Sequence, residues 1–142
     1  MKTSAAANVE RLAGTPATAV QAVVQRMNIA AGARERAICY ELLTKYAEAA
    51  RESGGASESA VVRSDIVSAQ KRFSGDLFHP DCGVRTHAAA LLAALADERP
   101  MAELASERYF SDFELTVRRA LLGGLLRFGS RGRSGYSFSL MD

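Results

Sequence analysis

The segment SDFELTVRRALLGGLLRF, residues 111–128, predicts a long helix that is apolar on nearly every side. Its main face carries Phe113, Val117, Ala120, Leu121, Gly124, Leu125 and Phe128. Leu115, Leu122 and Leu126 add apolar side chains outside that face. A helix with this pattern is either central in a bundle or shared with a partner. We therefore expect an all-α bundle with this helix near its centre, and Leu115, Leu122 and Leu126 as a candidate partner interface.

Local signals define the start and the packing of this helix. Ser111 and Glu114 have the spacing of a capping box, in which Ser caps the helix and Glu reaches back to it. The adjacent Gly123 and Gly124 each cost about 1 kcal/mol relative to Ala inside a helix. We expect close approach of a neighbouring helix to compensate for this cost.

Outward from this segment, the chain repeats the pattern of amphipathic helices. Thr15 followed by Pro16 is typical of a helix start, because Thr caps free N–H groups and Pro suits the first turn. A face of Ile38, Leu42, Leu43, Tyr46 and Ala50 marks the clearest helix. The pattern predicts a compact bundle of about five to seven helices. Their expected ranges are residues 5–13, 16–27, 33–52, 57–74, 84–95, 101–109 and 111–128.

The length of 142 residues fits one domain of ordinary size. We expect a single helical domain over residues 1–128, with a Gly/Ser linker at residues 53–57 between two helical halves. Residues 75–83 contain Pro and Gly among polar residues and predict an exposed loop. Residues 129–142 combine Arg, Ser, Gly and aromatic residues, and we expect a flexible, disordered tail there.

Composition restricts the location and the chemistry of the protein. Hydrophobic residues make up 48% of the chain, charged residues 24%, and the net charge is +2, which is typical of a globular protein. No run approaches the roughly 18 apolar residues of a membrane span, and the N-terminus lacks the apolar core of a secretory signal. Two distant cysteines favour a reducing cytoplasm, and the Ala-rich, Arg-preferring composition suggests a bacterial source. The Ala/Ser/Thr-rich N-terminus also resembles that of bacterial type III secretion substrates, so signal-peptide-independent secretion is an alternative.

His79, Cys82 and His87 form the one metal-like cluster in the sequence, and Cys39 is a fourth candidate ligand for zinc. Structural zinc sites usually draw on two close-set ligand pairs, which this spacing lacks. His87 also falls on the apolar stripe of its own helix. A hydrogen-bonded core histidine is therefore the competing interpretation, and we expect no cofactor. A thiol-dependent activity of Cys82 would require a base that the sequence does not identify.

Basic residues at two places form a candidate nucleic-acid surface. Arg63, Lys71 and Arg72 lie on one expected helix. Arg127, Arg131 and Arg133 lie near Tyr136, an arrangement that suits phosphate contacts and base stacking. The competing interpretation is a solubilising tail.

The sequence contains no glycine-rich phosphate loop and no HExxH or GxSxG motif. We therefore expect a non-enzymatic interaction protein with a regulatory, adaptor or assembly role, acting through helical faces on another protein or on a second copy of itself. The same pattern fits a homodimer as well as a monomer. The alternatives are a nucleic-acid-binding accessory or transcription-regulatory protein, and a small zinc- or thiol-dependent activity at His79, Cys82 and His87.

Overall fold

The computed structural model describes residues 15–30, 32–53 and 57–132, with side chains placed up to residue 128. These ranges contain six α-helices and one short 3₁₀ helix, η1, and no strand, which confirms the all-α class. Within them, no helix combines the length and apolar character that a membrane crossing requires. The elements in chain order are α2 (Pro16–Ile29), α3 (Ala33–Glu52), α4 (Ser57–Arg72), η1 (Ser74–Phe78), α5 (Cys82–Ala94), α6 (Arg99–Ser111) and α7 (Leu115–Gly132).

Two predictions fall largely outside these ranges. The helix expected over residues 5–13 lies entirely among residues that the structure does not describe. The expected tail is outside them from residue 133 onward, whereas the backbone of residues 129–132 continues α7 as helix.

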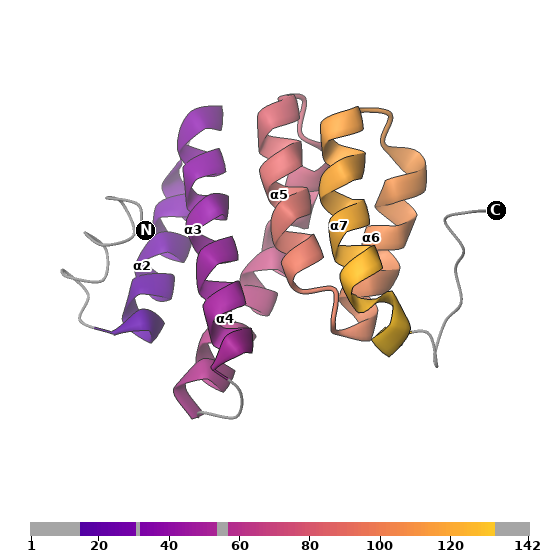
Figure 1. The fold of residues 1–142 in the computed structure, drawn as a ribbon. Coiled ribbons are helices and arrows are strands. Elements are labelled where there is room, and N and C mark those ends of the chain that lie inside the picture. The colour runs from indigo at the N-terminus through magenta and orange to yellow at the C-terminus, as the bar shows by residue number, and fades with distance from the viewer. Residues whose placement is uncertain (1–14, 31, 54–56, 133–142) are drawn as a thin grey trace. The chain divides into compact units, whose positions relative to one another are not determined.

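The chain divides into two compact units, Met1–Gly75 and Asp76–Asp142. Figure 1 shows α2, α3 and α4 in the first unit and α5, α6 and α7 in the second. The linker expected to separate two halves, residues 53–57, connects α3 to α4, which contact each other inside the first unit. The division falls instead at Gly75, within η1 of the predicted loop.

The first unit follows its local sequence signals closely. The Thr15 hydroxyl accepts a hydrogen bond from the Thr18 backbone N–H at 3.2 Å and caps α2, with Pro16 in its first turn. Helix α3 has the predicted bounds and buries Tyr40 and Leu43 among α2 and α4. The Tyr40 hydroxyl donates to the Phe73 carbonyl at 3.3 Å, which links α3 to the end of α4.

One residue of the expected α3 face is not part of the core. Ile38 is 44% exposed, while its neighbours Cys39 and Tyr40 are buried. The buried surface of α3 is therefore rotated from the predicted one, because α3 packs against two helices, α2 and α4, rather than one. The apolar periodicity of a helix predicts which of its faces is buried. It does not predict how many neighbouring helices pack against that face.

The second unit is a three-helix arrangement in which α7 contacts both α5 and α6 (Figure 1). Asp81 caps α5, since its carboxylate accepts a hydrogen bond from the Val84 N–H at 3.0 Å. Helix α6 starts with Pro100 in its first turn, two residues before the predicted start. Because short loops join the helices, α6 runs antiparallel to α5 and α7.

The predicted capping box before α7 is wrong in its cap residue. Ser111 is the last residue of α6, and its hydroxyl donates to the Glu107 carbonyl at 3.0 Å. Asp112 provides the turn instead, because its Oδ1 accepts a hydrogen bond from the Glu114 N–H at 2.9 Å. Phe113, expected on the buried face, is 93% exposed because it precedes α7, which begins at Leu115.

The expected close approach of helices is confirmed at one of the two glycines. A Cβ atom added to Gly124 would lie 2.6 Å from the Cα atom of Ala93 on α5, so only glycine fits there. A Cβ atom added to Gly123 would meet none of the described residues within 4 Å. The α5–α7 contact therefore depends on Gly124 and not on Gly123.

Candidate interaction surface

The two sides of α7 differ sharply in burial. The inner face, which packs on α5 and α6, consists of Val117, Leu121, Leu125 and Phe128, all at most 3% exposed. These residues recur at spacings of three and four, as a helix with one buried stripe requires. The inner face supplies part of the core of the second unit, together with buried residues of α5 and α6.

The outer face of α7 consists of Leu115, Arg119, Leu122, Gly123 and Leu126. Leu115 is 59% exposed and Leu126 is 68% exposed, while Leu122 is half-buried. At 3.6 residues per turn, the three leucines lie within about 20° of one line along the helix. The predicted partner-interface residues thus form one stripe on the side of α7 opposite the core.

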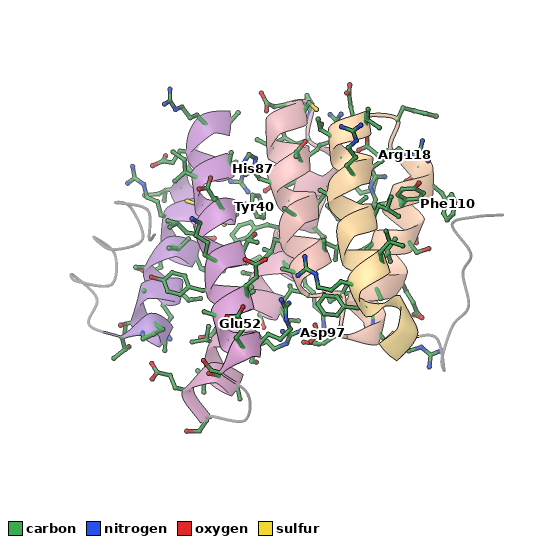
Figure 2. The ribbon with its side chains drawn as sticks, viewed as in Figure 1. Tyr40, Glu52, His87, Asp97, Phe110 and Arg118 are labelled. Carbon is green, nitrogen blue, oxygen red and sulfur yellow. The ribbon has the colours of Figure 1, made fainter. Side chains whose placement is uncertain are left out.

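Positive charge surrounds this stripe. Helix α7 contains Arg118, Arg119, Arg127 and Arg131 and neither Asp nor Glu. Arg118 lies on one side of the leucine line, with its guanidinium 4.6 Å from the centre of the Tyr109 ring on α6, and Arg127 lies on the other side. Figure 2 shows Arg118 on the part of α7 nearest its start. Arg119 forms no hydrogen bond or ion pair with the described residues.

A buried ion cluster fixes the start of α7. Asp112 Oδ2 accepts hydrogen bonds from Arg85 Nε at 3.1 Å and from Arg108 Nη2 at 3.2 Å. The three side chains are 5%, 16% and 9% exposed, in the order Asp112, Arg85, Arg108. Arg108 also donates to the Leu77 carbonyl at 3.1 Å, so η1, α5 and α6 meet at this carboxylate. Within the described residues Arg108 Nε is buried without a hydrogen-bond partner, while the shared carboxylate of Asp112 joins the three side chains at the start of α7.

Aromatic side chains are exposed near this cluster. Phe78 and Phe113 line a hollow of about 450 Å³ together with Arg108 and Asp112. The Arg108 guanidinium lies 4.1 Å from the centre of the Phe78 ring. Phe110 projects outward from α6 (Figure 2) and is 62% exposed. These three rings are further exposed apolar side chains of the second unit.

The predicted metal ligands are not arranged around a common point. Within the described ranges, no three His, Cys, Asp or Glu side chains are gathered so as to hold a metal ion. His79 Nδ1 accepts a hydrogen bond from the Asp81 N–H at 3.0 Å, and His87 Nδ1 lies 2.8 Å from the Gly83 carbonyl oxygen. Cys82 Sγ lies 3.6 Å from the Thr116 hydroxyl. Each predicted ligand therefore has a local structural contact.

Cys39, the fourth candidate ligand, belongs to the first unit and is buried. Burial raises the pKa of its thiol, and the nearby carboxylate of Glu35 raises it further. A thiol held in the protonated form is a weak nucleophile and a weak metal ligand. Cys39 lines an apolar hollow of about 570 Å³ between α2 and α3, where it acts as a small hydrophobic residue.

The predicted nucleic-acid residues are divided between the two units, and some of them lie outside the described residues. Lys71 and Arg72 are exposed at the end of α4, whereas Arg63 is half-buried. Arg63 and Arg72 are nine residues apart and so lie on opposite sides of that helix. Arg127 is exposed on α7 in the second unit. The Arg131 side chain, Arg133 and Tyr136 lie outside what the structure describes, so this interface stays a prediction.

Sequence reasoning found the leucines of the outer face but did not place Arg119 in their stripe or Gly123 on the surface. Helical spacing would have identified Arg119, which is four residues after Leu115 and three before Leu122. No local signal distinguishes Gly123 from Gly124, because their difference arises from Ala93 on α5. Comparisons of the chain with protein-family models, with curated proteins and with solved structures find no match.

Proposed function

We propose that this chain is a non-enzymatic protein that binds another protein through the outer face of α7, in a regulatory, adaptor or assembly role. One observation carries the proposal: Leu115 and Leu126 are exposed in line with Leu122, on the side of α7 opposite its core. Single exposed apolar residues are ordinary, but an aligned group near further exposed rings marks an interaction site.

The apolar character of the stripe favours a protein over a nucleic acid as the partner. Burial of leucine side chains against an apolar surface is favourable by roughly 25 cal/mol per Å² removed from water. A phosphate backbone offers no such surface and is bound by cations instead. Nucleic-acid binding through the basic residues is therefore the second hypothesis, and the test below includes it.

The contacts of His79, Cys82 and His87 support a non-enzymatic role. None of the hydrogen-bond partners of Cys82 in the described ranges is a base, because they are the hydroxyls of Thr86 and Thr116. Activation of a thiol nucleophile requires such a base or another means of lowering its pKa. We place the protein in the cytoplasm as part of the same proposal, since Cys39 and Cys82 are both free.

The proposal can be tested by site-specific photo-crosslinking. The full chain would carry benzoylphenylalanine at position 122 or 126 and be expressed in the cells that encode it. A matched control would carry the same group at Glu103, which is exposed on α6 of the same unit. We expect one protein adduct of the same mass from positions 122 and 126, and none from position 103.

Three outcomes would overturn the proposal. Equal crosslinking from position 103, or no adduct from either leucine position, would show that the outer face has no specific partner. A nuclease-sensitive adduct would replace the protein partner with a nucleic acid. An adduct with twice the mass of the chain would replace it with self-association.

A further inference from the structure

The arginines of the outer face lack carboxylate partners within the second unit as described. Arg85 and Arg108 both donate to Asp112, so this unit does pair guanidinium groups where they are buried. In contrast, Arg118 contacts the Tyr109 ring, Arg127 lies 5.4 Å from the Phe128 ring, and Arg119 has neither a hydrogen bond nor an ion pair among the described residues. A guanidinium over a ring keeps N–H donors available for a carboxylate.

The position of these arginines matches the requirements of a helical ligand. Leu115, Leu122 and Leu126 form a straight line of about 16 Å along α7, which corresponds to three helical turns. Arg119 lies beside that line, about 40° from its centre, Arg118 lies about 60° away on its other side, and Arg127 lies further round the helix, at about 120°. A ligand that covers the line with apolar side chains therefore meets positive charge along both of its edges.

Gly123 provides the second structural indication. It is exposed in the interior of α7, and a Cβ atom there would meet nothing within 4 Å. Glycine in such a position destabilises the helix without any compensating contact among the residues that the structure describes. Beside a leucine line, the absent side chain lets the backbone of a docking helix approach α7 closely.

We propose that the partner element is an acidic amphipathic helix, with apolar anchors at i, i+3, i+4 and i+7 and Asp or Glu on both sides of them. This inference rests on the proposed function and specifies the partner of the same surface. Charge complementarity disfavours the pairing of two α7 helices, because they would oppose arginine with arginine and no carboxylate. A nucleic acid would satisfy the arginines but would leave the leucines in water.

The experiment is a selection of helical 20-residue peptides from a phage-displayed library on the immobilised full-length protein. Enriched peptides would then be synthesised with a fluorophore and titrated in solution by anisotropy. We expect an apolar i, i+3, i+4, i+7 stripe flanked by Glu or Asp. A scrambled peptide of the same composition, and a version with Lys in place of Glu, serve as matched controls and should bind at least about tenfold more weakly.

Protein variants locate the site. Arg119→Glu should weaken the acidic peptide by at least about tenfold. Arg34→Glu on α3, which makes the same charge change at an exposed position of the first unit, should leave its affinity unchanged. Gly123→Leu should also weaken binding, since its side chain would occupy the approach path. Circular dichroism checks that all three variants keep their helix content.

The outcomes separate this inference from the proposed function. The selected peptides could carry the apolar stripe and require Leu122 but show no excess of Asp or Glu, with equal effects of Arg119→Glu and Arg34→Glu on their affinity. This result would overturn the acidic partner and would keep the outer face as the binding surface. A fourth variant, Leu122→Glu, places a charge in the leucine line, and a failure to find any peptide whose binding it weakens would overturn both the acidic partner and the surface. A dimer detected by light scattering would assign the outer face to a second copy instead. Binding of duplex DNA or RNA that is lost in Arg119→Glu and weakens steeply with salt would assign it to a nucleic acid.

Discussion

The inner and outer faces of α7 both carry leucine but differ in burial. Leu121 and Leu125 on the inner face are at most 1% exposed, while Leu115 and Leu126 on the outer face are more than half exposed. Burial against α5 and α6 gives the inner leucines a role in stability. The outer leucines have no such role within the described chain, and this difference separates residues that maintain the fold from residues that we propose contact a partner.

The adjacent glycines make the same comparison at a smaller scale. Gly124 lies on the inner side, where a Cβ atom would collide with Ala93. Gly123 lies on the outer side, where a Cβ atom would be free. The two glycines are therefore under different packing constraints. Substitutions on the two faces should change the free energy of unfolding by different amounts and even with opposite signs.

The largest effect is expected where the inner face is anchored. Asp112→Ala would leave Arg85 and Arg108 without their shared carboxylate in a buried cluster. Breaking a buried ion pair from one side typically costs about 3–5 kcal/mol. Urea unfolding of the full chain measures this loss. Glu114→Ala, two residues away and exposed, is the control and should change the free energy of unfolding by less than about 0.5 kcal/mol.

The two faces can be compared directly by truncating one leucine on each. Leu121→Ala should lower the free energy of unfolding by about 2–5 kcal/mol, because it removes a fully buried side chain and leaves a cavity. Leu126→Ala should change it by no more than about 0.5 kcal/mol. Urea titrations of the two variants provide the measurement. Similar losses for both variants would mean that α7 has no free face.

Gly124→Ala tests the closeness of the α5–α7 contact. The added methyl group would overlap the Ala93 backbone, and overpacking of this kind costs about 1–3 kcal/mol. Pairing it with Ala93→Gly, which removes the side-chain part of the collision, should recover some of the loss. A thermal unfolding midpoint unchanged by Gly124→Ala would contradict the observed helix spacing.

Gly123→Ala should have the smallest effect and the opposite sign. Alanine at this exposed helical position should raise the free energy of unfolding by about 0.5–1 kcal/mol, because it restricts the unfolded chain and meets no neighbour. Thermal unfolding would show the increase. A loss of stability would mean that a neighbour covers this side of α7 in solution, which would conflict with a free outer face.

Much of the helical framework could be predicted from local residue patterns. Thr15 and Pro16 start α2, and the apolar periodicity between residues 33 and 52 defines α3, because caps and amphipathic stripes act within one or two turns. The cap before α7 could not be predicted in this way. Ser111 and Asp112 are both good local candidates, and Arg85 and Arg108 decide between them by binding the carboxylate of Asp112.

For the candidate site, the amino-acid sequence determined that residues 115–126 carry more leucine than one helical face can hold, along with arginine and no acid. Spacing along the chain is enough for this, because a helix turns by a fixed angle at each residue. Only the tertiary structure decided which leucines are buried, which glycine is required and which arginines have no carboxylate. Those outcomes depend on residues such as Ala93 and Tyr109, whose contacts with α7 arise from packing and not from spacing along the chain.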